Sequence, residues 1–351
     1  MIYLDYSATT KVNDKVLEEF LLDCKKNHQE LESLILEEKN KIKKLLNTNL
    51  EVEYTSGATE SNNIVIKCIA NKYKEKGKRI ITTKLEHSSI LEPLEFLEKQ
   101  GFIIDYVNLN EGVVDLNHLE SLISKDTILI TIASVGSEVG ILQPVERIGE
   151  IAKENKILFH SDMTQSIGKL DISIKNIDLI SFSAHKFYGL KGIGVLLKNK
   201  DIYLDPLYPK KETFYYPLIK SVATALSLAT DNLKEKNLYV ESLNKEITNF
   251  LGKYSDVRIN SNEKAIPHIL NISIINSKPE TFQHRLEQYD VFVSTKSACH
   301  DDNDISLSVY AVTKNEKAAK TSLRISISSK TTKEEIKSFL RIFDICMKET
   351  I

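Results

Sequence analysis

Residues 179–194 read LISFSAHKFYGLKGIG, in which an apolar strand runs into a Ser-Ala-His-Lys turn before a second apolar strand begins. About twenty residues earlier, a predicted strand over 157–160 ends in the polar sequence His160-Ser161-Asp162. In an α/β sheet both strand ends open into the crevice at the carboxyl edge, where ligands bind. The stretch therefore predicts that Asp162 and Lys186 lie at one ligand-binding edge.

Asp162 and Lys186 are unusual residues for this position. A buried aspartate is costly unless it meets a cation or a strong donor, and a lysine that follows Ser183 and His185 at a sheet edge is oddly placed for a solvated surface charge. An aspartate paired with a pyridinium nitrogen and a lysine that forms a Schiff base fit both features, as in a pyridoxal 5'-phosphate (PLP) site. Taken singly, a capping aspartate and a lysine at a loop rim remain the alternatives.

Apolar strands alternate with amphipathic helices through the first two thirds of the chain. The expected helices cover 90–100 and 146–155. The expected strands cover 79–83, 103–107, 127–133, 157–160, 179–182 and 194–197. This alternation predicts an α/β fold with a mostly parallel sheet that helices cover on both faces.

The pattern changes after residue 217. One long helix is expected over 218–254, then strands over 270–275, 291–294 and 323–328, and a final helix from Lys333. This predicts a small α+β domain. We expect a large domain over 12–217 and a small domain made of 1–11 and 218–351.

Composition excludes several classes of function. The 351 residues carry a net charge of −2, which gives no overall field to attract nucleic acid or an anionic membrane. The four cysteines share no CxxC spacing, so we expect neither a metal site nor a disulfide framework. No signal peptide and no membrane-spanning run is found, which favours a cytoplasmic protein.

A second motif, TSGATESNN over 55–63, precedes a predicted helix. A hydroxyl-rich turn with glycine presents free N–H groups and the positive end of the helix dipole, which suits a phosphate. An ordinary N-cap is the alternative, because Thr or Ser with a nearby Glu is a common capping pattern.

Two long motifs, SAHKFYGLKGIG over 183–194 and TSGATESNN, are specific, and shorter ones follow in a fixed order. The shorter ones are Leu4-Asp5, Ala8-Thr9-Thr10, Glu86-His87, Glu138-Val139-Gly140, Gln143-Pro144, the stretch 160–165, Ser297-Ala298-Cys299 and Arg324-Ile325-Ser326. On these residues the chain resembles the cysteine desulfurases of the class V aminotransferase group, nearly end to end. The resemblance implies the PLP-dependent transferase fold type I, with a seven-stranded sheet, and a homodimer.

The resemblance also implies roles at the cofactor. Lys186 would hold PLP as a Schiff base and move the substrate's α-proton. Asp162 would pair with the ring nitrogen, Gln165 would hydrogen-bond the phenolic oxygen, and His87 would stack on the ring and assist proton transfer.

The phosphate and the substrate have their own implied partners. Arg324 would bind the substrate carboxylate through two parallel N–H···O hydrogen bonds, a bidentate pairing that lysine cannot form. The cofactor phosphate would be held by Ala58 (through its N–H), Thr59, Ser183 and His185.

Cys299 decides between related activities. It lies in STKSACHDDNDISLS (294–308), a polar stretch that predicts an exposed loop, and a cysteine there is more often reactive than buried. The resemblance implies that L-cysteine is converted to L-alanine and that Cys299 takes the sulfur as a persulfide. A sulfur-acceptor protein would then use it for iron–sulfur clusters or thiolated tRNA.

Three departures from the family pattern alter the pocket. The segment 208–217 lacks the expected Gly-rich and Arg-Ser-Gly-Thr elements, Gly136-Ser137 replaces Asn-Asn, and an early Asn-Pro-Ser-Ser loop is missing near 26–30. Two alternatives therefore stay open. One is a related PLP enzyme, such as a selenocysteine or cystine lyase or an aminotransferase, and the other is an inactive scaffold paralogue.

Overall fold

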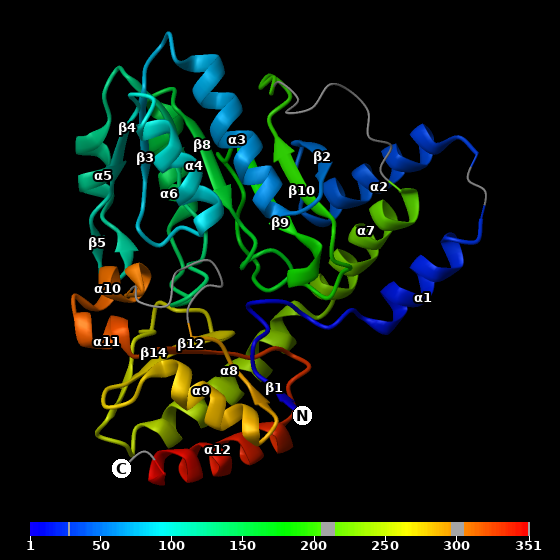
Figure 1. Cartoon of the computed structure of the whole chain (residues 1–351). Coiled ribbons are helices and arrows are strands. Elements are labelled where there is room, and N and C mark those ends of the chain that lie inside the picture. The colour runs from blue at the N-terminus through cyan, green and yellow to red at the C-terminus, as the bar shows by residue number, and fades with distance from the viewer. Residues whose placement is uncertain (27–28, 205–214, 296–304, 350–351) are drawn as a thin grey trace.

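The computed structural model describes residues 1–26, 29–204, 215–295 and 305–349. At its centre is a seven-stranded sheet with helices on both faces (Figure 1). Across the sheet the strands are β2 (Glu51–Thr55), β10 (Gly194–Lys198), β9 (Leu179–Ser183), β8 (Leu158–Asp162), β7 (Thr127–Thr131), β3 (Arg79–Thr82) and β4 (Ile103–Tyr106). Only β10 runs antiparallel to its neighbours, so the expected mostly parallel sheet is confirmed.

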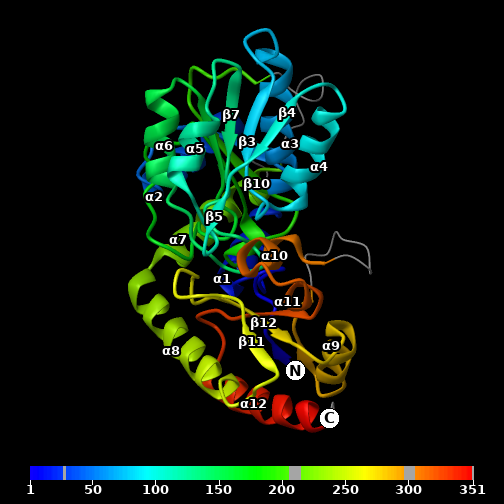
Figure 2. The same cartoon turned by 90° about the vertical axis from the view of Figure 1, so that its left-hand side faces the viewer.

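Helices cover the two faces of this sheet as separate layers (Figure 2). On one face, α3 (Ala58–Tyr73) and α4 (Ser88–Glu98) pack over apolar residues of β3, β7 and β9. The helices on the other face are α2 (Leu31–Leu45), α5 (Leu116–Leu122), α6 (Val145–Glu154) and α7 (Tyr216–Thr230). The sheet is thus buried on both sides, as parallel sheets usually are.

Strand burial explains which strands the sequence predicts and which it misses. All five residues of β7 and all five of β9 are buried, so these strands appear as continuous apolar runs. The edge strand β2 alternates instead, because Glu51 and Glu53 face solvent and lie near the ammonium of Lys198. That polar alternation is why β2 is absent from the expected strands.

The expected single helix over 218–254 is wrong. It is two helices, α7 and α8 (Leu233–Leu251), separated at Asp231 and Asn232, with Asn232 in the left-handed region (φ 49°). Ile219, Val222 and Leu226 of α7 lie in the core of the large sheet. We therefore propose that the boundary between the two domains lies at 231–232 instead of 217.

The small domain has its own sheet and core. Strands β11 (Val257–Ile259), β12 (Ile269–Ile274) and β14 (Ser322–Ser326) form an antiparallel sheet covered by α8, α9 (Pro279–Gln288) and α12 (Lys333–Lys348). Phe282, Phe339 and Phe343 stack at its centre. Thr332 is the N-cap of α12 and forms a capping box with Glu335. The helix therefore begins at Lys333, the residue expected from the sequence.

The amino terminus joins the small domain before it crosses to the large one. Strand β1 (Ile2–Tyr3) pairs in parallel with β13 (Val291–Phe292), and Leu4 lies in the small-domain core. Figure 1 shows this end of the chain beside α9 and α12. Helix α1 (Asp14–Asp23) then packs against α7. These contacts support our proposal that 1–11 belongs to the small domain.

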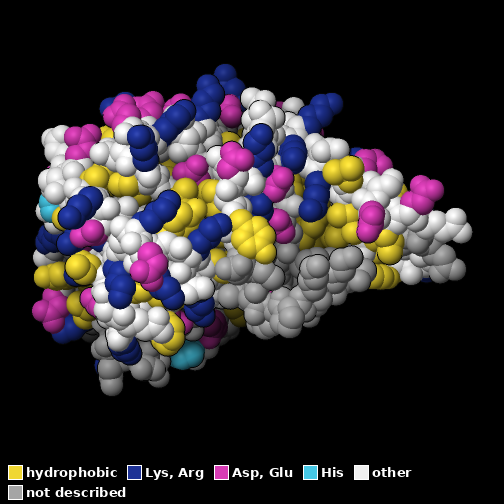
Figure 3. Space-filling model, turned by 90° about the horizontal axis from the view of Figure 1, so that it is seen from above, with side chains coloured by type: hydrophobic (Ala, Val, Ile, Leu, Met, Phe, Trp, Pro, Cys, Tyr) yellow, Lys and Arg dark blue, Asp and Glu magenta, His cyan; other side chains and the backbone are white. Residues whose placement is uncertain are grey.

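Shorter elements lie near the junction of the domains. They are the hairpin of β5 (Leu109–Asn110) and β6 (Val113–Val114), with α10 (Leu307–Thr313) and α11 (Glu316–Lys320). Seen from above, the large domain carries acidic and basic side chains interspersed over its surface (Figure 3). None of the helices in the described ranges is long and apolar enough to span a bilayer.

The carboxyl ends of the parallel strands all meet at the edge of the sheet that faces the small domain. There Gly194 begins β10 in contact with the residue before α3, since an added Cβ would lie 2.6 Å from the backbone of Gly57. This close approach holds the amino end of α3 next to the end of β9. Ligands of open α/β sheets bind at such an edge.

Candidate active site

A cavity of about 360 Å³ lies at this edge, between the sheet and the small domain. Its size is within the range of small-ligand pockets. Nine of the ten predicted site residues line it: Ala58, Thr59, His87, Asp162, Gln165, Ser183, His185, Lys186 and Arg324. The tenth, Cys299, lies outside the described residues.

Lys186 follows β9 in a short 3-10 turn and reaches the amino-terminal segment. Its ammonium donates to the carbonyl oxygens of Ser7 at 2.5 Å and Ala8 at 2.7 Å. Burial, helped by the charge of Arg324, lowers the pKa of Lys186 to about 8. An amine with this pKa is partly neutral near physiological pH and can therefore attack a carbonyl.

Asp162, the last residue of β8, is held by two donors. The side-chain amide of Asn62 donates to Oδ2 at 2.8 Å, and the N–H of Thr164 donates to Oδ1 at 2.9 Å. The carboxylate is 8% exposed and faces the cavity. Each carboxylate oxygen accepts more than one hydrogen bond, so Asp162 can also receive a proton donor from a ligand.

His87 is fixed at the start of α4 as its N-cap. Its Nδ1 accepts from the N–H of Ser89 at 3.1 Å, so the proton of the neutral ring is on Nε2. Ser89 Oγ also accepts from Asn62, which therefore links His87 to Asp162. Burial lowers the pKa of His87, which keeps the ring neutral near pH 7.

At the other end of the cavity the groups suit an anion. The N–H of Ala58, first residue of α3, donates to Ser183 Oγ at 2.7 Å, and Thr59 follows it. The Nδ1 of His185 contacts Thr9 Oγ1 at 3.1 Å. A helix N-terminus with hydroxyl and imidazole groups around it is a typical phosphate site.

Arg324, on β14, brings the small domain into the cavity. Its Nη2 forms an ion pair with Asp5 at 2.8 Å, and its Nη1 donates to the carbonyl oxygen of Ser137 at 3.1 Å. The Nε atom is buried and has no hydrogen-bond partner within the described ranges. Because buried donors are nearly always paired, this atom is available for an acidic ligand group.

Some residues of the site were not predicted from the sequence. Asn62 and Thr164 orient Asp162, Asp5 pairs with Arg324, and His160 lies beneath Asp162 between Thr131 and Ser181. Asn62 falls inside the TSGATESNN motif, so its helix was identified but its partner, 100 residues away, was not.

Of the three departures from the family pattern, two lie in or near the described structure. Ser137 lines the cavity, with a short hydroxyl where the family pattern has an amide. The departure near 26–30 lies just before α2, which begins at Leu31. The remaining departure, at 208–217, falls mostly within residues 205–214, which lie outside the described residues. Residues 296–304 also lie outside them.

Glu86 supplies a prediction on stability. It is buried beside His87 and accepts from Thr83 Oγ1 at 2.7 Å and from the N–H of Ala133 at 2.9 Å. Burial raises the pKa of Glu86 to about 8. The folded chain therefore keeps a proton between about pH 4.3 and 8 that the unfolded chain loses, so this group lowers the free energy of unfolding as pH rises through that window.

Glu86→Gln removes this pH dependence. We compare the free energy of unfolding of the variant with that of the unsubstituted chain at each pH. We expect this difference, variant minus unsubstituted chain, to increase by on the order of 3 kcal/mol between pH 5 and pH 8. Urea unfolding at both pH values measures it, with the exposed Glu95→Gln as the control. Equal stability differences at the two pH values would contradict an ionisation of Glu86 that burial suppresses.

Comparisons with known proteins agree with this geometry. Residues 2–209 match the model of the family described as aminotransferase class-V. The chain is 34% identical to a protein named cysteine desulfurase IscS from Clostridium botulinum, over 99% of this chain and 94% of that one. It is 36% identical to a protein of the same name from Buchnera aphidicola subsp. Schizaphis graminum, over 95% and 90%.

The chain belongs to the class V aminotransferase family. Among solved structures, one titled NifS-like protein has a TM-score of 0.91 and 32% identity, and each chain covers 99% of the other. A NifS-like protein from Rickettsia africae has a TM-score of 0.88 and 27% identity, again with 99% coverage of both chains. Both likenesses confirm the PLP-dependent fold type I that the sequence predicts.

Class V aminotransferases are PLP-dependent, and the cavity fits that cofactor. One end offers the N-terminus of α3 and the hydroxyl of Ser183 to a phosphate, and Asp162 offers a carboxylate to a ring nitrogen. Lys186 presents a buried amine of lowered pKa to an aldehyde. No group of three or more His, Cys, Asp and Glu side chains in the described ranges is arranged to hold a metal ion.

Proposed function

We propose that this class V aminotransferase is a PLP-dependent cysteine desulfurase that converts L-cysteine to L-alanine. The observation that carries the proposal is the meeting of Lys186, Asp162 and Arg324 in one cavity. In a chain about a third identical to relatives named cysteine desulfurase, these three residues supply an amine, a carboxylate and a guanidinium to an amino-acid substrate.

Bound PLP withdraws electrons from the substrate's α-carbon and so acidifies its proton. In our proposal Asp162 would keep the cofactor's ring nitrogen protonated, and His87, which lines the same cavity, would stack on the ring. Arg324 binds the substrate carboxylate and thereby fixes which bond at the α-carbon faces Lys186. The Nζ of Lys186, once free of the cofactor, accepts the α-proton, because its lowered pKa favours the neutral amine.

The phosphate anchor is part of the same proposal. Ala58 and Thr59 at the start of α3 would hold the phosphate together with Ser183 and His185. Burial lowers the pKa of His185 to about 4, so its ring is a neutral hydrogen-bond donor toward an anion. Gln165 would donate to the cofactor's phenolic oxygen.

Cys299 completes the reaction in this proposal. Its thiolate would attack the substrate sulfur and form a sulfur–sulfur bond while the carbon–sulfur bond of the substrate breaks. The electron pair of the broken bond would stay with the substrate, whose β-carbon takes a proton, so that Cys299 becomes a persulfide and the substrate leaves as alanine. The persulfide then passes to an acceptor protein for iron–sulfur clusters or tRNA thiolation. We also propose that the protein is a cytoplasmic homodimer.

The Cys299→Ser variant tests this assignment. We expect it to bind PLP and to show a change of the cofactor absorption with L-cysteine, but to lose nearly all alanine and sulfide formation, because no thiolate accepts the sulfur. Cys24→Ser, a half-buried cysteine on the end of α1, is the matched control and should keep full activity. Sulfide release that survives in Cys299→Ser would contradict the role of Cys299.

Ser137 favours one alternative, a related PLP enzyme with another amino-acid substrate. Its small side chain lines the cavity next to the contact between Arg324 and the Ser137 carbonyl. Selenocysteine, cystine and ordinary amino-donor substrates are the candidates. A screen of amino acids for a change of the cofactor spectrum separates the two functions, since a desulfurase should respond to L-cysteine and release alanine.

A further inference from the structure

A buried lysine that the proposed mechanism does not use lies four residues after Gln165. Lys169 is only 9% exposed, and its amine donates to Gln165 Oε1 at 2.6 Å. Burial, with the charges of Lys186 and Arg324, lowers the pKa of Lys169 to about 7. A lysine is costly to bury beside other cations, so its position in this place calls for a function.

The backbone fixes Lys169 against Gln165. Residues 163–170 form helical turns, in which the N–H of Ile167 donates to Met163 and the N–H of Leu170 donates to Ser166, both at 2.9 Å. The 2.6 Å contact shows that the Lys169 and Gln165 side chains lie on the same side of these turns. Gly168 has a φ of 75° and packs so closely on Phe187 that a Cβ would lie 2.7 Å from it, which holds the turn in place.

The contact determines which way the Gln165 amide points. An amide has an accepting oxygen and a donating nitrogen, and either arrangement fits the same space until a neighbour selects one. The Lys169 amine has N–H groups in both its charged and its neutral form and donates one of them to Oε1, so it selects the oxygen. The Nε2 atom of Gln165 is therefore turned the other way and donates to the carbonyl oxygen of Ser7 at 3.1 Å. Gln165 and Ser7 both line the large cavity.

We propose that Lys169 is a positioning residue that fixes Gln165 as a hydrogen-bond donor toward the cofactor cavity. This inference rests on the proposed function, because it assigns Gln165 a partner on the bound cofactor. Without Lys169 the amide could turn its oxygen to the cavity and repel an anionic oxygen there. Lys169 thus sets the polarity of one wall of the site without touching the ligand.

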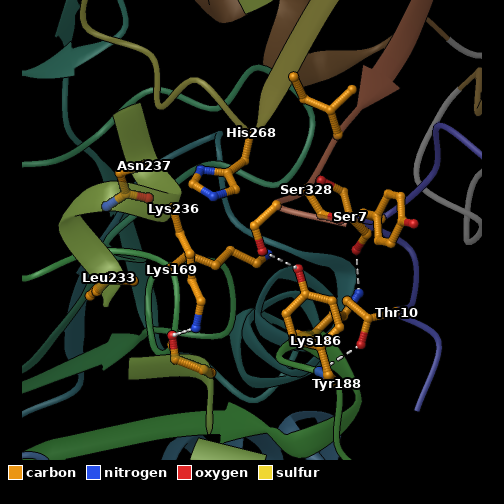
Figure 4. A pocket seen from close by; sticks show the side chains of 15 residues that line it. Ser7, Thr10, Lys169, Lys186, Tyr188, Leu233, Lys236, Asn237, His268 and Ser328 are labelled. Carbon is orange, nitrogen blue, oxygen red and sulfur yellow. Dashed lines mark hydrogen bonds between the residues drawn. The ribbon is translucent and has the colours of Figure 1, made fainter. Parts of the chain in front are cut away.

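The same lysine lines a second, smaller cavity of about 20 Å³ on the other side of Lys186 (Figure 4). Figure 4 shows Lys169 beside His268, with Lys236 and Asn237 on the neighbouring helix α8. Lys236 has other partners, because its ammonium donates to the carbonyl oxygens of Leu228 at 2.7 Å and Ala229 at 3.3 Å. It is therefore a matched control, a lysine near the same cavity without contact to Gln165.

The test is the pH midpoint at which the absorption band of the bound cofactor changes. A donor at the phenolic oxygen favours its deprotonated form, so losing the donor should raise the midpoint. We expect Lys169→Met and Gln165→Leu each to raise it by about one pH unit, and Lys236→Met to leave it unchanged. Lys169→Gln, which keeps an N–H donor, should shift it less than Lys169→Met.

A double variant separates positioning from simple loss of charge. If Lys169 acts through Gln165, the Lys169→Met/Gln165→Leu protein should have the midpoint of Gln165→Leu alone. Additive shifts would show that Lys169 acts on the cofactor by its own charge and would overturn the inference, as would an unchanged midpoint in Lys169→Met. A complete absence of a cofactor band in the unsubstituted protein would instead overturn the proposed function, and this inference with it.

Discussion

Replacing Lys186 with alanine is expected to abolish covalent binding of the cofactor and to lower alanine formation from L-cysteine by at least about 1,000-fold. The residue combines two tasks in our proposal, attachment of the cofactor and transfer of the α-proton. The only other buried amine at the site, within the described ranges, is that of Lys169, which is held by Gln165. The Lys169 amine is therefore not placed to replace the amine of Lys186.

The matched control for this variant is Lys191→Ala, an exposed lysine in the same loop. It should keep the cofactor spectrum and the activity. Capture of PLP by the apoprotein adds a second readout, because attack needs the neutral amine. The capture rate should rise with pH to a midpoint near the pKa of about 8 that burial gives Lys186. Activity of Lys186→Ala within tenfold of the unsubstituted protein would contradict both tasks.

The second large effect is expected for Asp162→Asn. A neutral amide cannot hold a protonated ring nitrogen, so alanine formation should fall roughly 100- to 1,000-fold, in the range found when one preorganised electrostatic group is removed. The substitution also costs a hydrogen bond, because Asn62 and Thr164 both donate to this side chain and an amide has only one accepting atom. We expect a stability loss of about 1 kcal/mol from that mismatch.

Asp178→Asn is the control for Asp162→Asn. Asp178 precedes β9, accepts from the N–H of Phe159 at 3.0 Å and does not line the cavity. It should lose some stability and keep the rate per cofactor-loaded protein. Thermal unfolding, cofactor titration and single-turnover alanine assays distinguish the two variants. Equal rates for both, after correction for bound cofactor, would exclude a charge-dependent role of Asp162.

The sheet and half of the site follow from the sequence for a physical reason. Strands buried on both faces must be continuously apolar, so β8 and β9 are visible, and with them Asp162 and Lys186 at their ends. The break between α7 and α8 has no glycine or proline: α7 ends just before Asp231, whose backbone is extended, and Asn232 follows in the left-handed conformation. Asp and Asn favour such turns, but without glycine or proline they are a weak signal within a long helical pattern.

The remaining site residues depend on contacts between distant segments. In the sequence nothing distinguishes Asn62 from the other residues of its helix. Only the fold brings its side-chain amide to the carboxylate of Asp162. Lys169 looks like a solvated lysine in the sequence, whereas the turn around Gly168 buries it. Nothing near Asp5 in the sequence indicates its ion pair, because its partner Arg324 lies 319 residues later.

The amino-terminal segment determines when this protein can become active during synthesis. Asp5 and Ser7 leave the ribosome long before β14 does, but Asp5 pairs with Arg324 and the N–H of Ser7 donates to Ser326 at 2.9 Å. The Ser7 carbonyl in turn accepts from Lys186. A nascent chain can thus form its large sheet early, while the cavity stays open on one side until β14 emerges. Assembly of the site therefore has to wait for the synthesis of β14.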